Sequence, residues 1–81
     1  MYYVYILYSP SIQKYYKGQT NDLEDRLKRH NQGRNKYTQR GSPWELRWSC
    51  TKENRSSAVR LETVLKKYSQ EKILEFIAKY S

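Results

Sequence analysis

The chain is poor in cysteine, in acidic residues and in long apolar runs, and each shortage excludes a class of protein. Its one cysteine, Cys50, cannot form an internal disulfide, and without a Cys/His cluster it offers no ligand set for structural zinc. No apolar run is long enough to span a bilayer, and the N-terminus lacks the basic region and cleavage site of a secretory signal. These absences predict a soluble, cytoplasmic protein that does not bind membranes.

The chain also has far fewer acidic than basic residues. Eight Asp and Glu residues stand against sixteen Lys and Arg residues, which gives a formal charge of +8 over 81 residues. Between Arg26 and Arg40 there are six basic residues and no acidic one. Such a stretch attracts phosphate through its field and through counterion release, although a charged run can also be only a solvated surface. For so small a chain the imbalance favours nucleic acid as the partner.

The order of apolar segments predicts one α+β domain over residues 1–81. Tyr, Val and Ile in residues 2–8, followed by the run 13–19, predict a β-hairpin. The alternation of apolar and polar residues over 44–48 predicts a third strand that faces the core on one side, with an extension through Cys50 left open. A third strand can pair with the hairpin to make a three-stranded sheet.

Three helices are expected beside these strands, in the order β-β-α-β-α-α. Asn21 is a suitable N-cap for the first helix, Glu24 lies three residues later as in a capping box, and Gly33 is a natural stop. The second helix is expected over 57–67, and Ser69 is a good N-cap for the last one. Helices in this arrangement would cover the faces of the sheet.

Two tyrosines of the hairpin are candidates for chemistry. Strand alternation places Tyr5 and Leu7 on one face of the first strand, and Tyr5 is expected roughly opposite Tyr16, so that two phenols lie side by side. Gly18 removes a side chain from the same face, which would let a substrate backbone come close. Tyrosine is also an ordinary strand residue, and for the other tyrosines packing is the better interpretation.

Arg26 and His30 are one helical turn apart and would project from one side of the first helix, beside Leu23 and Leu27. Arginine can hold a phosphate with two hydrogen bonds, and histidine can move a proton near neutral pH. The alternative is an exposed basic helix whose histidine faces water, and the spacing alone favours that alternative.

Glu62 lies at the margin of the apolar stripe of the second expected helix. A carboxylate there could bind Mg²⁺ or a similar ion, because such ions are often held by one or two carboxylates, waters and a substrate phosphate. The alternative is an ordinary ion pair with Lys66, and Glu62 taken by itself favours that alternative.

Taken together, these motifs resemble the GIY-YIG nuclease family, above all its small stand-alone bacterial members. The matching segments are YVYIL at 3–7, YKG at 16–18, TNDLEDRLKRHNQG at 20–33, KYT at 36–38, SPWEL at 42–46 and AVRLETVLK at 58–66. Tyr3 stands where the first motif usually has Gly, and Lys17 stands where the second has Ile. The resemblance implies a three-stranded antiparallel sheet flanked by helices, and hydrolysis of a phosphodiester with one divalent cation.

The resemblance also implies a role for each candidate. Glu62 would bind the metal, Mg²⁺ or Mn²⁺. Tyr5 would contact or deprotonate the attacking water, and Tyr16 would orient water or phosphate. Arg26 would hold the scissile phosphate. His30 would assist as a base or as a phosphate contact, and the choice between Tyr5 and His30 as the base stays open.

The function expected from this set is a metal-dependent endonuclease, with DNA as the expected polymer, in repair or recombination. Seven further residues are expected to contact nucleic acid: Lys17, Gly18, Lys28, Arg29, Arg34, Lys36 and Arg40. The alternatives are a binding module with weak or no catalysis and an interaction subunit of a larger nuclease. The enzyme is favoured, because the Glu62 carboxylate would repel phosphate unless a cation lay between them. A monomer or weak oligomer is expected.

Overall fold

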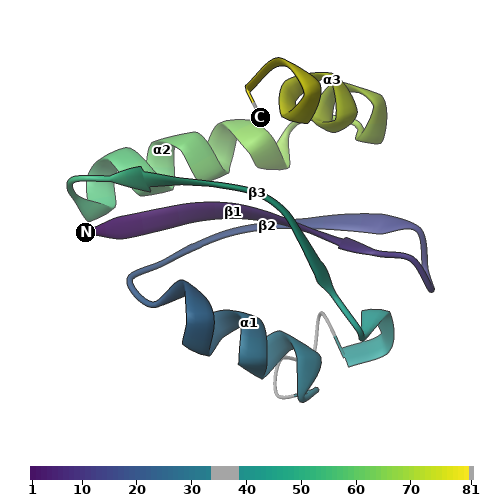
Figure 1. Ribbon diagram of the computed structural model, residues 1–81. Coiled ribbons are helices and arrows are strands. Elements are labelled where there is room, and N and C mark those ends of the chain that lie inside the picture. Colours follow the sequence, from purple (N-terminus) through teal and green to yellow (C-terminus); the bar gives the residue numbers. More distant parts are fainter. Residues whose placement is uncertain (34–38, 81) are drawn as a thin grey trace.

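The structure, a computed structural model, describes residues 1–33 and 39–80. Within these residues the elements are β1 (Tyr2–Ser9), β2 (Lys14–Thr20), α1 (Leu23–Asn31), the short 3₁₀ helix η1 (Gln39–Gly41), β3 (Glu45–Lys52), α2 (Arg55–Lys66) and α3 (Gln70–Tyr80). The sheet has the strand order β2-β1-β3, and β1 is antiparallel to both neighbours (Figure 1). The predicted α+β class, the three-stranded antiparallel sheet and the order β-β-α-β-α-α are confirmed.

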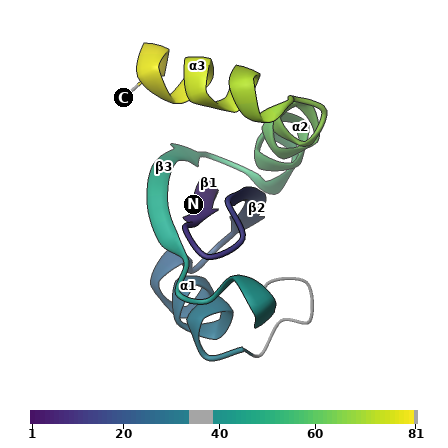
Figure 2. The ribbon, with the colours of Figure 1, turned by 90° about the vertical axis from the view of Figure 1, so that its right-hand side faces the viewer.

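Helices cover both faces of the sheet, with α1 on one side and α2 and α3 on the other (Figure 2). The central strand β1 therefore contributes to two separate cores. One core contains Val4, Ile6, Ala58, Leu65 and Ile73, and the other contains Tyr5, Leu7 and Trp44. Because successive side chains of a strand point to opposite faces, alternate residues of β1 belong to different cores. Tyr5 and Leu7 share a face as predicted.

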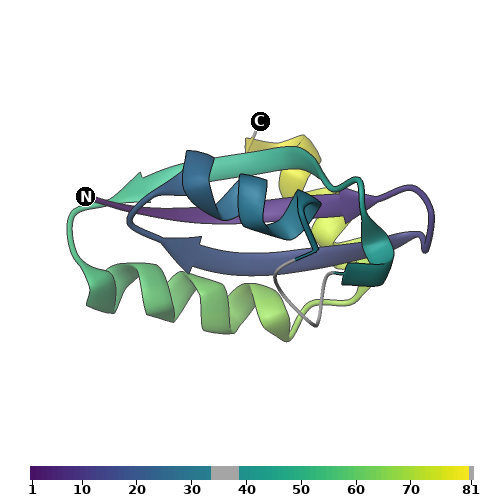
Figure 3. The same ribbon diagram turned by 90° about the horizontal axis from the view of Figure 1, so that it is seen from below.

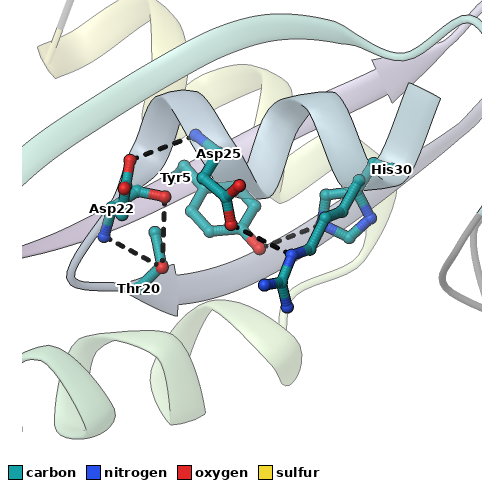
Figure 4. A network of polar contacts seen from close by, with 6 residues as sticks. Tyr5, Thr20, Asp22, Asp25 and His30 are labelled. Atoms are coloured by element: carbon teal, nitrogen blue, oxygen red, sulfur yellow. Dashed lines mark hydrogen bonds and ion pairs between the residues drawn. The ribbon is translucent and has the colours of Figure 1, made fainter. Parts of the chain in front are cut away.

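Helix α1 begins one residue later than predicted. Asp22 is its N-cap, since the Asp22 Oδ1 atom accepts a hydrogen bond from the Asp25 N–H at 3.1 Å (Figure 4). Thr20 fixes the preceding turn, because its Oγ1 accepts a hydrogen bond from the Asp22 N–H at 3.1 Å. The prediction of Asn21 as the N-cap is wrong. Asn and Asp are equally good N-caps, so the sequence alone did not distinguish these two neighbours. Gly33 follows the last turn with φ of +73°, and this confirms the predicted stop.

Strand β3 is longer than predicted and contains a bulge. A register shift against β1 inserts one extra residue between Leu46 and Trp48. Trp44 consequently packs in the core beneath α1, whereas Trp48 packs against the core beneath α2 and α3. The prediction that residues 44–48 face the core on one side is therefore wrong.

The remaining helices begin at polar caps. Helix α2 starts at Arg55, earlier than predicted, because the Asn54 side chain accepts a hydrogen bond from the Ser57 N–H at 2.9 Å. Helix α3 follows Ser69, whose Oγ accepts a hydrogen bond from the Lys72 N–H at 3.3 Å, and this confirms the predicted cap. No helix in the described part of the chain has both the length and the apolar character that a membrane crossing requires.

Candidate active site

The Tyr5 side chain reaches from the central strand β1 across the edge strand β2. Tyr5 is paired with Gly18, and Leu7 is paired with Tyr16. A Cβ atom on Gly18 would lie 2.6 Å from the Tyr5 hydroxyl oxygen and 2.7 Å from its Cζ, so the phenol lies directly over the glycine. The space at Gly18 is therefore filled by Tyr5 and does not admit a substrate backbone. The two phenols are diagonal neighbours, with ring centroids 6.3 Å apart.

His30 belongs to the last turn of α1, and its side chain forms a hydrogen bond with Tyr5 (Figure 4). The Tyr5 hydroxyl oxygen is 3.1 Å from His30 Nε2, and the two residues are 1% and 0% exposed. Burial, and then the charge of Arg26, lower the pKa of His30 to about 4, so the ring is neutral at neutral pH. The alternative of a water-facing histidine is wrong, because His30 is buried and bonded to Tyr5.

Two charged groups from different helices lie close to the Tyr5 hydroxyl. Burial raises the pKa of Tyr5 well above its ordinary value, Tyr16 and the Glu62 carboxylate raise it further, and the Arg26 guanidinium opposes them by charge and by a hydrogen bond. Tyr5 is therefore a protonated phenol at neutral pH. The charges of Arg26 on α1 and Glu62 on α2 thus both act on one hydroxyl group of β1, and Arg26 also bonds to it.

Tyr16 lies on the same face of the sheet and is half-buried. Its ring meets the His30 ring edge to face, with centroids 4.8 Å apart, and lies 6.2 Å from the Trp44 ring. Aromatic contacts of this kind hold a ring in one orientation. Tyr16 therefore forms one side of the cluster and keeps part of its surface open.

Asn31 supports the cluster although sequence reasoning did not single it out. Its Oδ1 accepts a hydrogen bond from the Trp44 N–H at 2.5 Å, and its Nδ2 donates to the Trp44 carbonyl at 3.2 Å. These bonds join the end of α1 to the segment before β3, and so help to hold the neighbouring His30 in place. An amide that directly follows the candidate histidine is the only signal that the sequence offered for this role.

Glu62 lies on α2, which runs alongside the edge strand β2 (Figure 3). Its side chain is 17% exposed, and its Oε2 is 3.3 Å from Lys66 Nζ, so the ion pair considered as the alternative is present. On β2, burial and then the charge of Lys66 lower the pKa of Lys17. The Glu62 carboxylate thus pairs with Lys66 and also acts on the Tyr5 hydroxyl through its charge.

The oxygen donors at Glu62 fit a hard divalent cation such as Mg²⁺ or Mn²⁺. Mg²⁺ in particular keeps several waters and binds through one or two carboxylates together with substrate phosphate oxygens. In residues 1–33 and 39–80 no group of three or more His, Cys, Asp or Glu side chains could hold a metal ion. A cation at this site would therefore depend on Glu62 and on oxygens of the substrate.

Three other residues predicted to contact nucleic acid, Lys28, Arg29 and Arg40, do not join this cluster. Lys28 and Arg29 lie on the exposed side of α1, where each pairs with a carboxylate one turn earlier, at 3.9 and 3.0 Å. Arg40 is exposed on η1. Arg34 and Lys36 lie outside the described residues.

Comparison with known proteins agrees with this arrangement of strands, helices and polar residues. Residues 1–74 match the family model of the GIY-YIG catalytic domain. A UPF0213 protein of Clostridium perfringens (strain 13 / Type A) is 38% identical over 82 residues, which cover 100% of this chain and 87% of that protein. A UPF0213 protein of Vibrio campbellii is 38% identical over 58 residues, which cover 70% of this chain and 56% of that protein.

A solved structure shows the same fold. The solution NMR structure of a UPF0213 protein from Bacillus halodurans matches with a TM-score of 0.64 and 30% identity, over 99% of this chain and 86% of that one. The fold and the ordered motifs define a protein of nuclease type. The chain belongs to the GIY-YIG catalytic domain family.

Proposed function

We propose that this protein is a divalent-metal-dependent endonuclease that hydrolyses phosphodiester bonds of nucleic acid, with DNA as the expected polymer. The observation that carries the proposal is the Tyr5 hydroxyl, which is hydrogen-bonded to His30 and lies within the electrostatic influence of Arg26 and Glu62. A base, a phosphate-binding cation and a metal-binding carboxylate around one hydroxyl are the groups that this hydrolysis requires. The expectations of a role in repair or recombination, of a cytoplasmic location and of a monomer or weak oligomer belong to the same proposal.

Tyr5 and His30 would handle the proton of the attacking water. At neutral pH the phenol is protonated and the imidazole is neutral, so a phenol that donates to Nε2 can transfer its proton along the 3.1 Å hydrogen bond. As the water gives a proton to the Tyr5 oxygen, Tyr5 would pass its own proton to His30. His30 would then act through Tyr5, in keeping with its complete burial.

Three other side chains would complete the reaction. Arg26 would hold the scissile phosphate with paired hydrogen bonds and stabilise the charge that develops on it. Tyr16 would orient the water or the phosphate from the open side of the cluster. Glu62 would hold the divalent cation, which lowers the pKa of bound water and neutralises charge on the phosphate.

Cleavage of a panel of labelled nucleic acids tests this proposal. Linear, single-stranded and branched DNA and RNA are incubated with Mg²⁺, with Mn²⁺ or with a chelator. The wild type is compared with Glu62→Gln and with a control, Glu75→Gln, which removes an exposed carboxylate of α3. We expect metal-dependent cleavage by the wild type and the control and no product from Glu62→Gln. Cleavage that persists in Glu62→Gln would contradict the assignment of the metal ligand.

One observation favours a second function, a nucleic-acid-binding module without catalysis. The Lys66 ammonium neutralises the Glu62 carboxylate at 3.3 Å, so Glu62 is compatible with a nearby phosphate even without a cation. A binding module predicts salt-sensitive binding, no product with any metal, and equal affinities for the wild type and Glu62→Gln. The same panel, run together with a binding assay, separates the two functions.

A further inference from the structure

A polar hollow of about 190 Å³ lies beside the candidate active site. It is lined by Tyr2, Gln19, Thr20, Asn21, Arg26 and Arg55. They come from β1, the end of β2, the turn after it, α1 and the first residue of α2. The connections from β2 to α1 and from β3 to α2 lie at the same end of the molecule (Figures 1 and 3). None of the described residues that line the hollow carries a carboxylate.

Two guanidinium groups from different helices share this hollow. Arg26 comes from the middle of α1, and Arg55 is the first residue of α2. A guanidinium has five N–H donors in a planar fork, so Arg26 can face the Tyr5 hydroxyl with some donors and the hollow with others. The side-chain amides of Gln19 and Asn21 add neutral donors to the same space. The hollow is therefore rich in donors and positive charge.

We propose that this hollow is a phosphate subsite, in which Arg55 binds the substrate phosphate next to the scissile phosphate and Arg26, which holds the scissile phosphate, also contacts this neighbour. The inference rests on the proposed function, because Arg26 connects the hollow to the site of cleavage. Guanidinium forks match phosphate oxygens in charge and in planar geometry. The ligand class is therefore a polynucleotide backbone with at least two consecutive phosphates, and Arg55 positions the strand relative to Tyr5.

Binding without cleavage tests the subsite. Fluorescence anisotropy measures the affinity for labelled single-stranded and duplex DNA of one sequence, in chelator and over a range of salt concentrations. Arg55→Gln is compared with Arg60→Gln, which removes an exposed arginine of the same helix that does not line the hollow. We expect Arg55→Gln to weaken binding about threefold to tenfold and to reduce the salt slope by roughly 0.7–0.9, while Arg60→Gln binds as the wild type does. Equal losses in both variants would overturn the subsite, and so would absence of DNA binding by the wild type.

A double-substitution cycle tests whether the two arginines share one phosphate. If they do, the binding losses of Arg26→Gln and Arg55→Gln will not add in the double variant. Additive losses would overturn the shared subsite. Inorganic phosphate, compared with chloride at equal ionic strength, should displace DNA only at millimolar concentration. Displacement at micromolar concentration would assign the hollow to free phosphate and overturn the inference.

The outcome for the subsite is distinguishable from the outcome for the nuclease. If the wild type cuts DNA but Arg55→Gln binds as Arg60→Gln does, the subsite is wrong and the nuclease stands. If no metal supports cleavage but Arg55→Gln alone loses affinity, the hollow binds phosphate and the nuclease is wrong.

Discussion

Gly18 leaves room for the Tyr5 phenol, which lies directly over it. A methyl group at this position would lie 2.6 Å from the phenol oxygen, closer than real contacts allow, and the buried ring has little room to retreat. We expect Gly18→Ala to lower the free energy of unfolding by about 1–3 kcal/mol, as overpacking does. Urea denaturation measures the change.

The same substitution in a variant without the Tyr5 phenol separates the clash with the ring from a general effect of alanine in the strand. In Tyr5→Leu the phenol is gone, so Gly18→Ala should cost measurably less there than in the wild type. An equal cost in both backgrounds would show that the contact with Tyr5 is not the cause.

His30 predicts a pH dependence of stability. Its folded pKa of about 4 lies below its ordinary 6.5, so the unfolded chain binds the proton more readily and stability falls as pH drops through this window. We expect a loss of about 2 kcal/mol between about pH 7 and about pH 5. Urea denaturation of the wild type at the two pH values measures it, with His30→Gln as the control that should lose less.

An NMR titration gives an independent readout if His30→Gln does not fold. The chain contains a single histidine, so its ring signal is unambiguous. The ring of the folded wild type should stay neutral down to about pH 5. A midpoint near the ordinary value would contradict the burial of the ring.

The sequence could predict which polar side chains gather at Tyr5, but not how exposed they are. The motifs singled out Tyr5, Arg26, His30 and Glu62, which the structure brings together. Spacing alone favoured a water-facing His30, because its burial depends on partners that are distant in the chain. One such partner is Tyr16, whose ring lies 4.8 Å from it.

At the level of secondary structure, the start of α1 provides a test with its own matched control. Asp22 caps the helix through the Asp25 N–H, whereas the neighbouring Asn21 does not. We expect Asp22→Ala to cost about 1 kcal/mol in the free energy of unfolding, and Asn21→Ala to stay within about 0.5 kcal/mol. Thermal or urea unfolding of the two variants measures the difference, and the reverse order would contradict the assigned cap.

Local patterns predicted the existence and the order of the elements well. They failed where two neighbouring residues were equally good caps, and where pairing with another strand set the register. Asn21 and Asp22 are equally good caps, so the choice between them depends on the turn made by Thr20. The bulge in β3 arises from its register against β1, which the alternation of β3 alone does not encode. Trp44 and Trp48 therefore lie on opposite faces of the sheet.

The whole molecule carries a formal charge of +8, and this predicts strongly salt-dependent binding. Each phosphate that the protein neutralises releases condensed counterions, so affinity for DNA should fall at least about tenfold between about 50 and 200 mM salt. Anisotropy titrations measure the slope, and polyglutamate as a competitor controls for non-specific attraction to any polyanion. Binding that does not change with salt would contradict a phosphate-directed surface.

In this small molecule the two side chains proposed to transfer the proton are also side chains of the core. Tyr5 belongs to the core formed with Leu7 and Trp44, and His30 is buried against it. Because buried polar pairs are often replaced by apolar residues with a gain in stability, a lineage that needed only binding would be free to lose both side chains. Selection for higher stability and selection for nuclease activity would thus oppose each other at Tyr5 and His30.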